Sequence, residues 1–402
     1  MKNPSQAADA ATLSQLIRAR IARSPERRIS FAEFMELALY HPQYGYYAGN
    51  VSQLGFRGDF VTSVHLGNDF GELIAEQLAE MWHKLTCPHP FQLVEMGPGQ
   101  GLLAATILSH LRARHPDCLA AIRYTLIEKS PALKAAQQTR LQPWQEQGLS
   151  LHWCDLSDLA PDSITGCLFS NELVDALPVH RVTLTEQGLQ ECYVASADNA
   201  MRPFQIITGP LSTPALAAYF KEIDITLATP PYPIGFTTEV NLAALDWIEQ
   251  VGQVLHRGYV MTIDYGYPAE RYYGPTRSHG TLQCYSRHAY HDDPLINVGQ
   301  QDITAHVDFT ALERRGQQQG LTTLGNLPQA LFLMALGLGD RLSELAQWQG
   351  TDGATLTTAI RRRDCLHQLM NPMGLGKFNV LVQGKGLATP SQQKLKGLTV
   401  PA

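Results

Sequence analysis

The sequence predicts an α/β protein built on a doubly wound, mostly parallel sheet, with a helical N-terminal cover and an inserted β-hairpin. Two observations carry this prediction. Short apolar strand candidates alternate with helix candidates from Phe91 to Asp264, and a glycine-rich turn follows the first strand of the series. Strands that alternate with helices pair in parallel through right-handed crossovers, and the helices then cover both faces of the sheet.

The composition is that of a folded globular protein with a weakly acidic surface. Of the 402 residues, 44% are hydrophobic and 17% are charged, and the formal net charge is −6. This length fits one large α/β domain with additions, or two tightly joined parts. Because a negative surface repels phosphate backbones, we expect no nucleic-acid partner, although the totals leave room for a local basic groove.

Residues 1–90 are expected to form a helical cover ahead of the sheet. The stretch Leu13–Tyr40 predicts two helices, and Ser30 begins a capping-box pattern at the start of the second one. Tyr40–Phe60 is rich in tyrosine and glycine and predicts a loop. Apolar residues at helical spacing predict a further helix over Glu72–Leu85.

Residues 91–180 are expected to form the first part of the α/β core. Ser130-Pro131 predicts a helix start, since serine is a good N-cap and proline fits the first helical position. The strand candidates are Phe91–Glu95, Tyr124–Glu128, Leu149–Trp153 and Gly166–Ser170.

Residues 181–238 are expected to be an insertion, and residues 239–402 to complete the core and the acceptor side. Two alternating runs flank Gln187-Gly188 and predict a β-hairpin, which a Pro-rich loop over Thr229–Phe236 follows. A helix ending near Leu255 leads into the next strand. The remaining candidates are strands Tyr259–Asp264, Leu321–Leu327 and Lys377–Gln383, and helix Leu312–Gln319.

Cysteine spacing and hydropathy favour a cytoplasmic protein. The seven cysteines are scattered without a C-x-x-C pair, which is typical of reduced thiols. The richest apolar run, Leu331–Leu338, is too short for a membrane span. Leu13–Arg28 is arginine-rich like a mitochondrial presequence, which makes the mitochondrial matrix the alternative compartment. Asp9 and Glu26 favour a surface helix instead.

The turn Glu95–Gly101 is the sharpest local signal for a ligand. Glycines let the chain bend tightly after the strand and let a ligand approach the backbone, while the following helix offers unpaired N–H groups. A dinucleotide site would need G-x-G-x-x-G. Gly97 and Gly99 match that pattern, but the third position is Leu102 and the glycine falls one residue early, at Gly101. This spacing disfavours a pyrophosphate site, and the turn alone could be only a tight connection.

Acidic residues strengthen the signal because they close three consecutive strands. Glu95 ends the first strand, Glu128 ends the second, and Asp155 with Leu156 follows the third. Ligands of open α/β sheets bind at the carboxyl ends of the strands, where a carboxylate can accept two ribose hydroxyls. Glu95 suits a cationic ligand better than a phosphate, so the pattern favours S-adenosyl-L-methionine (SAM), with no metal.

The fourth strand ends in a second group of polar residues. Asn171 and Glu172 are expected at the lip of the sheet, and Asp175 follows within one turn. Two carboxylates there could bind a cationic nucleophile and accept its proton. Acids at a helix N-terminus are an equally good explanation of the same residues.

With these motifs together, the chain resembles the MidA family of class I SAM-dependent methyltransferases. This family includes a mitochondrial complex I assembly factor described as a protein-arginine methyltransferase. The matching stretches are Ile29–Tyr47, Gly58–Leu73, Val94–Gly101, Leu126–Pro131, Ser170–His180, Ile263–Gly266, Gly280–Phe309 and Met373-Gly374. One departure is Val64-His65, where the family usually has Pro-Glu.

The resemblance implies a Rossmann-like class I fold, a lid over the donor within residues 1–90, and two sets of site residues. It implies that SAM is contacted by Asp59, Thr62, Ser63, Glu95, Gly97, Gly99, Gly101, Glu128, Asp155, Leu156 and Asn171. It implies that the acceptor pocket and its chemistry involve Glu172, Asp175, Asp264, Tyr265, His306 and Asp308.

The expected reaction is methyl transfer from SAM to a protein or small-molecule acceptor. An arginine nitrogen of a protein is the candidate acceptor atom. An arginine guanidinium stays protonated in proteins, so paired carboxylates would have to bind it and take its proton. Glu172 and Asp175 are the candidates, with Asp264 as an alternate. Two other functions remain open: a small-molecule O- or N-methyltransferase, and a SAM-binding assembly factor that acts mainly by protein contact.

Overall fold

The structure is a computed structural model that describes residues 4–49, 62–199, 201–286, 289–347 and 353–399. Its centre is a seven-stranded sheet in the order β16-β17-β10-β5-β2-β3-β4. The strands are β2 (Phe91–Met96), β3 (Ile122–Ile127), β4 (Ser150–Cys154), β5 (Ile164–Asn171), β10 (Leu255–Asp264), β16 (Thr322–Pro328) and β17 (Asn379–Lys385). β17 runs antiparallel to both of its neighbours, and the other paired strands are parallel. The predicted doubly wound sheet is therefore confirmed, with one reversed strand near its edge.

Helices cover both faces of the central sheet because successive strand residues point to opposite sides. In β2, Leu93 belongs to the core cluster on one face and Val94 to the cluster on the other. The first face is covered by α4 (Asp69–Lys84), α5 (Leu102–Arg114), α6 (Pro116–Ala121), α7 (Pro131–Glu146), α12 (Gln329–Leu336) and α14 (Gly353–Met370). The second face is covered by α9 (Leu242–Val254) and α11 (Phe309–Gln318).

Local signals set several of these boundaries where the sequence predicts them. Ser130 caps α7 by accepting the Leu133 N–H, and Ser30 caps α2 by accepting the Glu33 N–H. The helix predicted over Glu72–Leu85 begins three residues earlier, at Asp69. The hairpin expected around Gln187-Gly188 is present as part of a second sheet.

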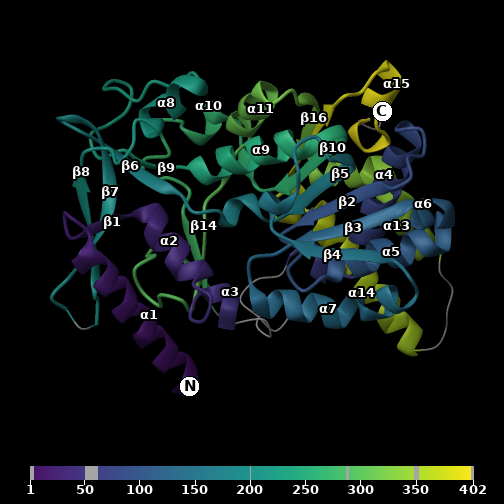
Figure 1. Ribbon diagram of the computed structural model, residues 1–402, viewed down its shortest axis with the longest axis horizontal. Coiled ribbons are helices and arrows are strands. Elements are labelled where there is room, and N and C mark those ends of the chain that lie inside the picture. Colours follow the sequence, from purple (N-terminus) through teal and green to yellow (C-terminus); the bar gives the residue numbers. More distant parts are fainter. Residues whose placement is uncertain (1–3, 50–61, 200, 287–288, 348–352, 400–402) are drawn as a thin grey trace.

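Four strands of the second sheet lie between β5 and β10 in the chain, the fifth is the N-terminal strand β1, and the N-terminal helices cover the sheet (Figure 1). Its order is β1-β7-β6-β9, with β8 also paired to β7. Its strands are β1 (Arg28–Ser30), β6 (His180–Thr185), β7 (Gly188–Ser196), β8 (Phe204–Gly209) and β9 (Thr237–Val240). The helices α1 (Pro4–Arg23), α2 (Phe31–Tyr40) and α3 (Tyr46–Gly49) share a separate core cluster with it. Residues 4–49 thus cover the insertion, whereas α4, inside the expected 1–90 segment, packs on the central sheet.

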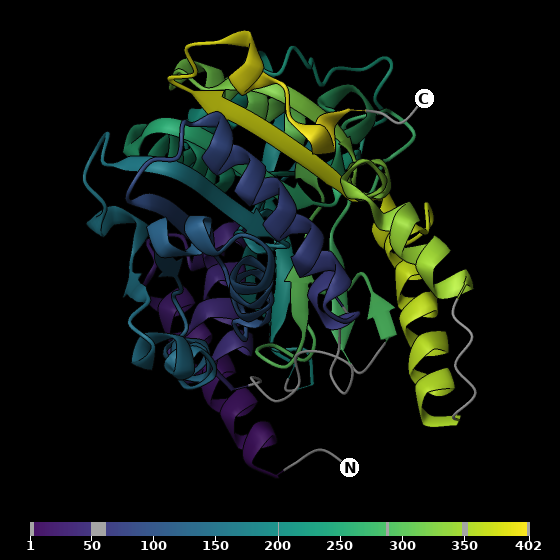
Figure 2. The same ribbon diagram turned by 90° about the vertical axis from the view of Figure 1, so that its right-hand side faces the viewer.

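Shorter elements complete the molecule. They are the strands β11 (Gly266–Tyr267), β12 (Gln283–Ser286), β13 (Ala289–His291), β14 (Asp302–Thr304) and β15 (Val307–Asp308), the helices α8 (Ala215–Glu222), α10 (Ala269–Tyr272), α13 (Leu338–Ala346) and α15 (Pro390–Gln393), and the 3₁₀ turns η2 (Ser63–His65), η3 (Leu156–Asp158), η4 (Val174–Ala176), η5 (Leu375–Lys377) and η6 (Lys396–Leu398). In the view of Figure 2 the C-terminal strand β17, yellow, runs diagonally across the upper part of the molecule, and α14, yellow-green, lies at the lower right. No helix in the described ranges is long and apolar enough to cross a membrane.

Candidate active site

A cavity of about 960 Å³ opens at the carboxyl edge of the central sheet. Strand register explains why the predicted residues meet there. Met96 pairs with both Ile127 and Ser170, and Ile127 pairs with Cys154, so four neighbouring strands end at one level. The residues that follow those strand ends consequently lie along one edge, where open α/β sheets bind ligands.

The glycine turn forms one wall of the cavity, and its backbone requires glycine. Gly97, Gly99 and Gly101 have φ angles of 68°, 52° and 73°, a region that side chains other than glycine rarely adopt. A Cβ atom at Gly99 would meet no atom within 4 Å, so this backbone borders open space that a ligand can fill. Gly97 and Gly99 line the cavity, while Gly101 lies behind them as the N-cap of α5.

Glu128 is held at the cavity by a buried glutamine that the sequence analysis did not single out. Its Oε1 accepts the Ser130 N–H at 2.8 Å, and its Oε2 accepts from Gln137 Nε2 at 3.1 Å. The same Gln137 nitrogen donates to the Gly99 carbonyl at 2.7 Å. Gln137 therefore couples the carboxylate after β3 to the turn after β2. The signal that could have found it is a glutamine four residues from both Leu133 and Leu141, on the apolar face of a predicted helix.

The acids at the strand ends occupy two different environments. Glu95 is buried and accepts the Tyr124 hydroxyl at 2.7 Å, and burial raises its pKa to about 7. Burial likewise raises the pKa of Glu128 to about 7. Asp155 is exposed at the rim as the N-cap of η3, and Leu156 follows it in the cavity wall.

The predicted lid is described only from Thr62 onward, and Asp59 lies outside the described residues. Thr62 lines the cavity. Ser63 is buried beneath it, and its N–H donates to Glu172 Oε1 at 3.3 Å. His65, which stands where the family usually has glutamate, also lines the cavity and places its Nδ1 2.8 Å from Thr62 Oγ1. In this chain His65 thus fastens the start of η2 over the cavity.

Asn171, which ends β5, and Glu172 and Asp175, which follow it, all line the cavity. Glu172 has a φ of 54°, an unusual backbone conformation that is often found at functional sites. Within the described chain, buried oxygens of all three residues lack a hydrogen-bond partner: Asn171 Oδ1, Glu172 Oε2 and Asp175 Oδ1. These oxygens are available to accept from a bound ligand.

Burial, followed by repulsion from neighbouring acids, raises the pKa values of Glu172 and Asp175. Burial, and then the charge of Asp175, raise the pKa of Glu172 to about 8. The pKa of Asp175 is raised well above its ordinary value by burial and by the charges of Asp264 and Asp302. A carboxyl group that holds its proton near neutral pH is matched to general acid–base chemistry.

The remaining four predicted acceptor residues do not line the cavity. Asp264 is fully buried and accepts the Val174 and Asp175 N–H groups at 2.8 and 3.3 Å, so it positions the turn that carries Asp175. Tyr265 donates to Thr304 Oγ1 at 2.6 Å, behind that turn.

The side-chain partners of His306 and Asp308 do not line the cavity either. The His306 ring packs against the rings of Tyr265 and Tyr267, and burial lowers its pKa to about 4. Asp308 caps α11 and accepts the Tyr219 hydroxyl at 2.9 Å. These contacts are structural, so the structure joins Glu172 and Asp175 with the donor side but does not bring His306 or Asp308 to it.

The cavity is also lined by residues that the sequence analysis did not single out. Tyr40, Tyr47 and Asp302 line it, from α2, α3 and β14. Tyr47 donates to Asp302 Oδ1 at 2.9 Å, and the rings of Tyr40 and Tyr47 lie 5.3 Å apart. Asp302 belongs to the matching stretch 280–309, but no pattern in that stretch distinguished it from its neighbours. On the donor side, Trp247 of α9 also lines the cavity, although its helix was recognised only as a core element.

This sheet order, with a glycine turn and strand-end acids around one cavity, is that of a methyltransferase fold with a site for a nucleoside-type ligand. The model of a family described as S-adenosyl-L-methionine-dependent methyltransferases matches residues 73–327. The chain belongs to this family, and it is a SAM-dependent methyltransferase of the MidA type.

Similar proteins support the same assignment over most of the chain. The protein arginine methyltransferase NDUFAF7 homolog, mitochondrial, of Drosophila melanogaster is 31% identical over 83% of this chain and 77% of its own length. The human protein arginine methyltransferase NDUFAF7, mitochondrial, is 30% identical over 87% of this chain and 79% of its own. A Burkholderia thailandensis structure bound to S-adenosyl-homocysteine is 30% identical, with a TM-score of 0.83, and covers 99% of this chain and 97% of that one.

Proposed function

We propose that this enzyme transfers the SAM methyl group to a guanidinium nitrogen of a protein arginine. The observation that carries the proposal is the acidic acceptor end, where Glu172, Asp175 and Asp302 share one wall with two tyrosine rings. Carboxylates bind a planar guanidinium through charge-assisted, bidentate hydrogen bonds, and aromatic faces attract it as well. The names of the curated relatives, which include arginine methyltransferase, point the same way.

The donor-side residues fit SAM. Gly99 borders open space at the turn, and Asn171 Oδ1 has no partner among the described residues. In the proposed site Glu128 accepts the ribose hydroxyls, Asp155 accepts from the exocyclic amine, and the glycine turn receives the amino-acid portion. Thr62 and Ser63 close over it. SAM supplies an activated methyl group on a sulfonium, so the chain has to contribute binding, orientation and a proton acceptor.

The acceptor-side residues then have distinct roles. Glu172 holds the guanidinium, concentrates its lone pair on one nitrogen, and takes the proton that this nitrogen loses as the N–C bond forms and the S–C bond breaks. Asp175 holds the second edge of the guanidinium. Asp264 acts as a positioning residue because it fixes the backbone of the η4 turn. Tyr265, His306 and Asp308 are proposed to support this wall from behind rather than to touch the reacting atoms.

The test is to label a lysate of a strain that lacks the gene with tritiated SAM and purified enzyme, and to hydrolyse the labelled species. Methylarginine in a labelled protein is the expected result. Label in a small molecule would mean that the acceptor is a small molecule and not a protein arginine. If a variant that cannot transfer methyl groups still fully supports assembly of a partner protein, the assembly-factor function would be favoured.

For the compartment we propose a reducing, cytosol-like environment. All seven cysteines are free thiols in the structure, which supports this proposal. The names of the curated relatives include mitochondrial, so the matrix is the alternative. Imaging of the tagged chain in its own cells would decide between the two.

A further inference from the structure

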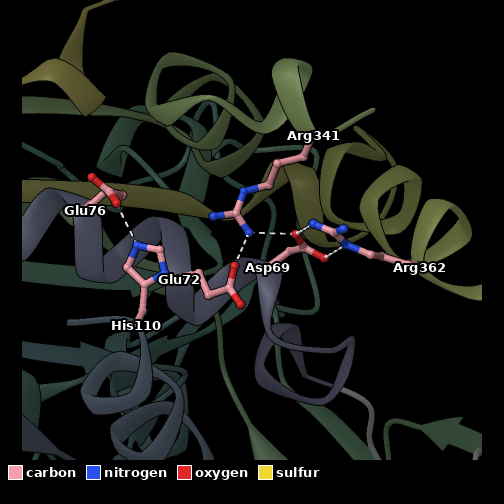
Figure 3. A network of polar contacts seen from close by, with 6 residues as sticks. All are labelled: Asp69, Glu72, Glu76, His110, Arg341 and Arg362. Atoms are coloured by element: carbon pink, nitrogen blue, oxygen red, sulfur yellow. Dashed lines mark hydrogen bonds and ion pairs between the residues drawn. The ribbon is translucent and has the colours of Figure 1, made fainter. Parts of the chain in front are cut away.

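A second cluster of ligand-type side chains lies outside the SAM cavity, between α4 and the corner where α5 meets α6. Glu76 comes from the middle of α4, His110 from the last turns of α5, and His115 is the N-cap of α6. None of the three lines the cavity. Figure 3 shows Glu76 and His110 facing each other across the two helices.

Both imidazoles direct the same ring nitrogen at one carboxylate. His110 Nε2 lies 2.6 Å from Glu76 Oε1, and His115 Nε2 lies 3.1 Å from Glu76 Oε2. One ligand atom from each residue can be chosen so that all three lie within 4.8 Å of one another. Zinc binds histidine nitrogen and carboxylate oxygen at about 2.0–2.2 Å, which separates neighbouring ligands by roughly 3.4 Å. Small side-chain rotations suffice to reach that separation.

We propose that Glu76, His110 and His115 bind a divalent transition-metal ion of the zinc class. Two neutral imidazoles and one carboxylate carry a net charge of −1, and this ligand set suits zinc and its neighbours rather than magnesium or calcium. Among the described ion pairs, Glu76 has only these two histidines as basic partners.

The neighbouring acidic residues do not share the ion pairs of this cluster. The adjacent acids of α4 are already neutralised by arginines: Arg341 contacts Asp69 and Glu72, and Arg362 contacts Asp69 (Figure 3). The three side chains are 35%, 12% and 25% exposed for Glu76, His110 and His115, so an ion can enter and keep water at a fourth position. Such an ion clamps α4 to the α5–α6 corner and stabilises the fold without taking part in methyl transfer.

A second, weaker pair has to be removed before the site can be tested. Cys87 Sγ lies 3.6 Å from His83 Nδ1 on the exposed end of α4, and a thiol with an imidazole also binds zinc. The experiment therefore uses tag-free, chelator-treated full-length protein that carries His83→Gln and Cys87→Ser as its background.

Cobalt is titrated into this background protein and followed by its visible absorption, and zinc is then added in competition. The expected result is one equivalent of cobalt, displaced by zinc, and a higher melting temperature with zinc. Glu76→Gln, which keeps the hydrogen-bonding shape, and His110→Gln should each weaken binding by about tenfold or more and remove the thermal shift. His152→Ala, an exposed histidine on β4, is the matched control and should change neither quantity.

Each variant is checked for S-adenosylhomocysteine affinity, which should match the background because the cluster lies outside the cavity. No cobalt or zinc binding by the background protein would overturn the proposal. Equal affinity in the background protein, Glu76→Gln and His110→Gln would overturn it as well, since the ion would then bind elsewhere.

Discussion

Glu172→Gln is the substitution that separates chemistry from binding at this site. Glutamine keeps the size of the side chain and can still accept the Ser63 N–H, so the lid contact survives. The oxygen that lacks a partner, Oε2, is replaced by an amide NH2 group. This group is neutral and cannot take a proton. We expect SAM affinity within a few-fold of wild type, and turnover lower by about 10²–10⁴, the usual range for a general base.

Because the pKa of Glu172 is raised, its loss of a proton on acceptor binding can be measured. A value of about 8 means that Glu172 is mostly protonated in the empty site at pH 7. A cation about 4 Å away in a partly buried site attracts a carboxylate by roughly 4 kcal/mol, which lowers its pKa by about 3 units. Binding of a cationic acceptor should therefore release close to one proton near pH 7, and Glu172→Gln should abolish most of that release.

The assay combines single-turnover methylation of the identified acceptor with calorimetry of acceptor binding in two buffers of different ionisation enthalpy. Glu36→Gln is the matched control, since Glu36 lines the outer wall of the cavity and lies 3.7 Å from Lys129. It should alter KM and leave turnover nearly unchanged. Near-normal turnover by Glu172→Gln, with unchanged proton release, would refute the reasoning, and the base would then be sought at Asp175.

Three further predictions concern the donor side and the stability of the unliganded enzyme. Glu128→Ala should weaken S-adenosylhomocysteine by about tenfold or more, through loss of roughly 1.5–3 kcal/mol of charge-assisted bonding; an unchanged calorimetric Kd would remove Glu128 from the site. Gln137→Ala should weaken the same ligand less, and the double variant should show less than the sum of both effects, because Gln137 acts through Glu128. Burial raises the pKa of Glu172 from 4.5 to about 8, so between these pH values the folded state binds more protons than the unfolded state. The stability of the unliganded enzyme should therefore fall as pH rises from 4.5 to 8. Thermal unfolding of Glu172→Gln should show a smaller fall, and an equal slope in both proteins would contradict the prediction.

The central fold could be predicted because its signals are local. Strand and helix candidates alternate within short windows, and caps such as Ser130 act within three residues of themselves. Boundaries shifted by a few residues where tertiary packing extends an element, as at Asp69 of α4, which two arginines from the C-terminal helices neutralise. The association of β1 with β7, far along the chain, had no local signal at all.

The meeting of the strand-end residues at one cavity was predictable for a related reason. Parallel strands bring their carboxyl ends to one edge of the sheet. The residues that follow Met96, Ile127, Cys154 and Asn171 therefore lie close together regardless of loop conformation. Gln137 escaped because its function depends on what it contacts, 38 residues away at Gly99, rather than on a motif.

The acceptor side was only half predictable because it is assembled from segments far apart in the chain. Tyr47 and Asp302, hydrogen-bonded to each other, are separated by 255 residues, and neither follows a strand of the central sheet. Glu172 and Asp175 were identifiable because they follow such a strand, whereas Asp264 turned out to hold the turn that carries Asp175. In the proposed site, the donor is held by residues that follow strands of the central sheet, whereas the acceptor is chosen by residues of α2, α3 and β14. Substitutions in these three elements should therefore change the acceptor without changing the donor.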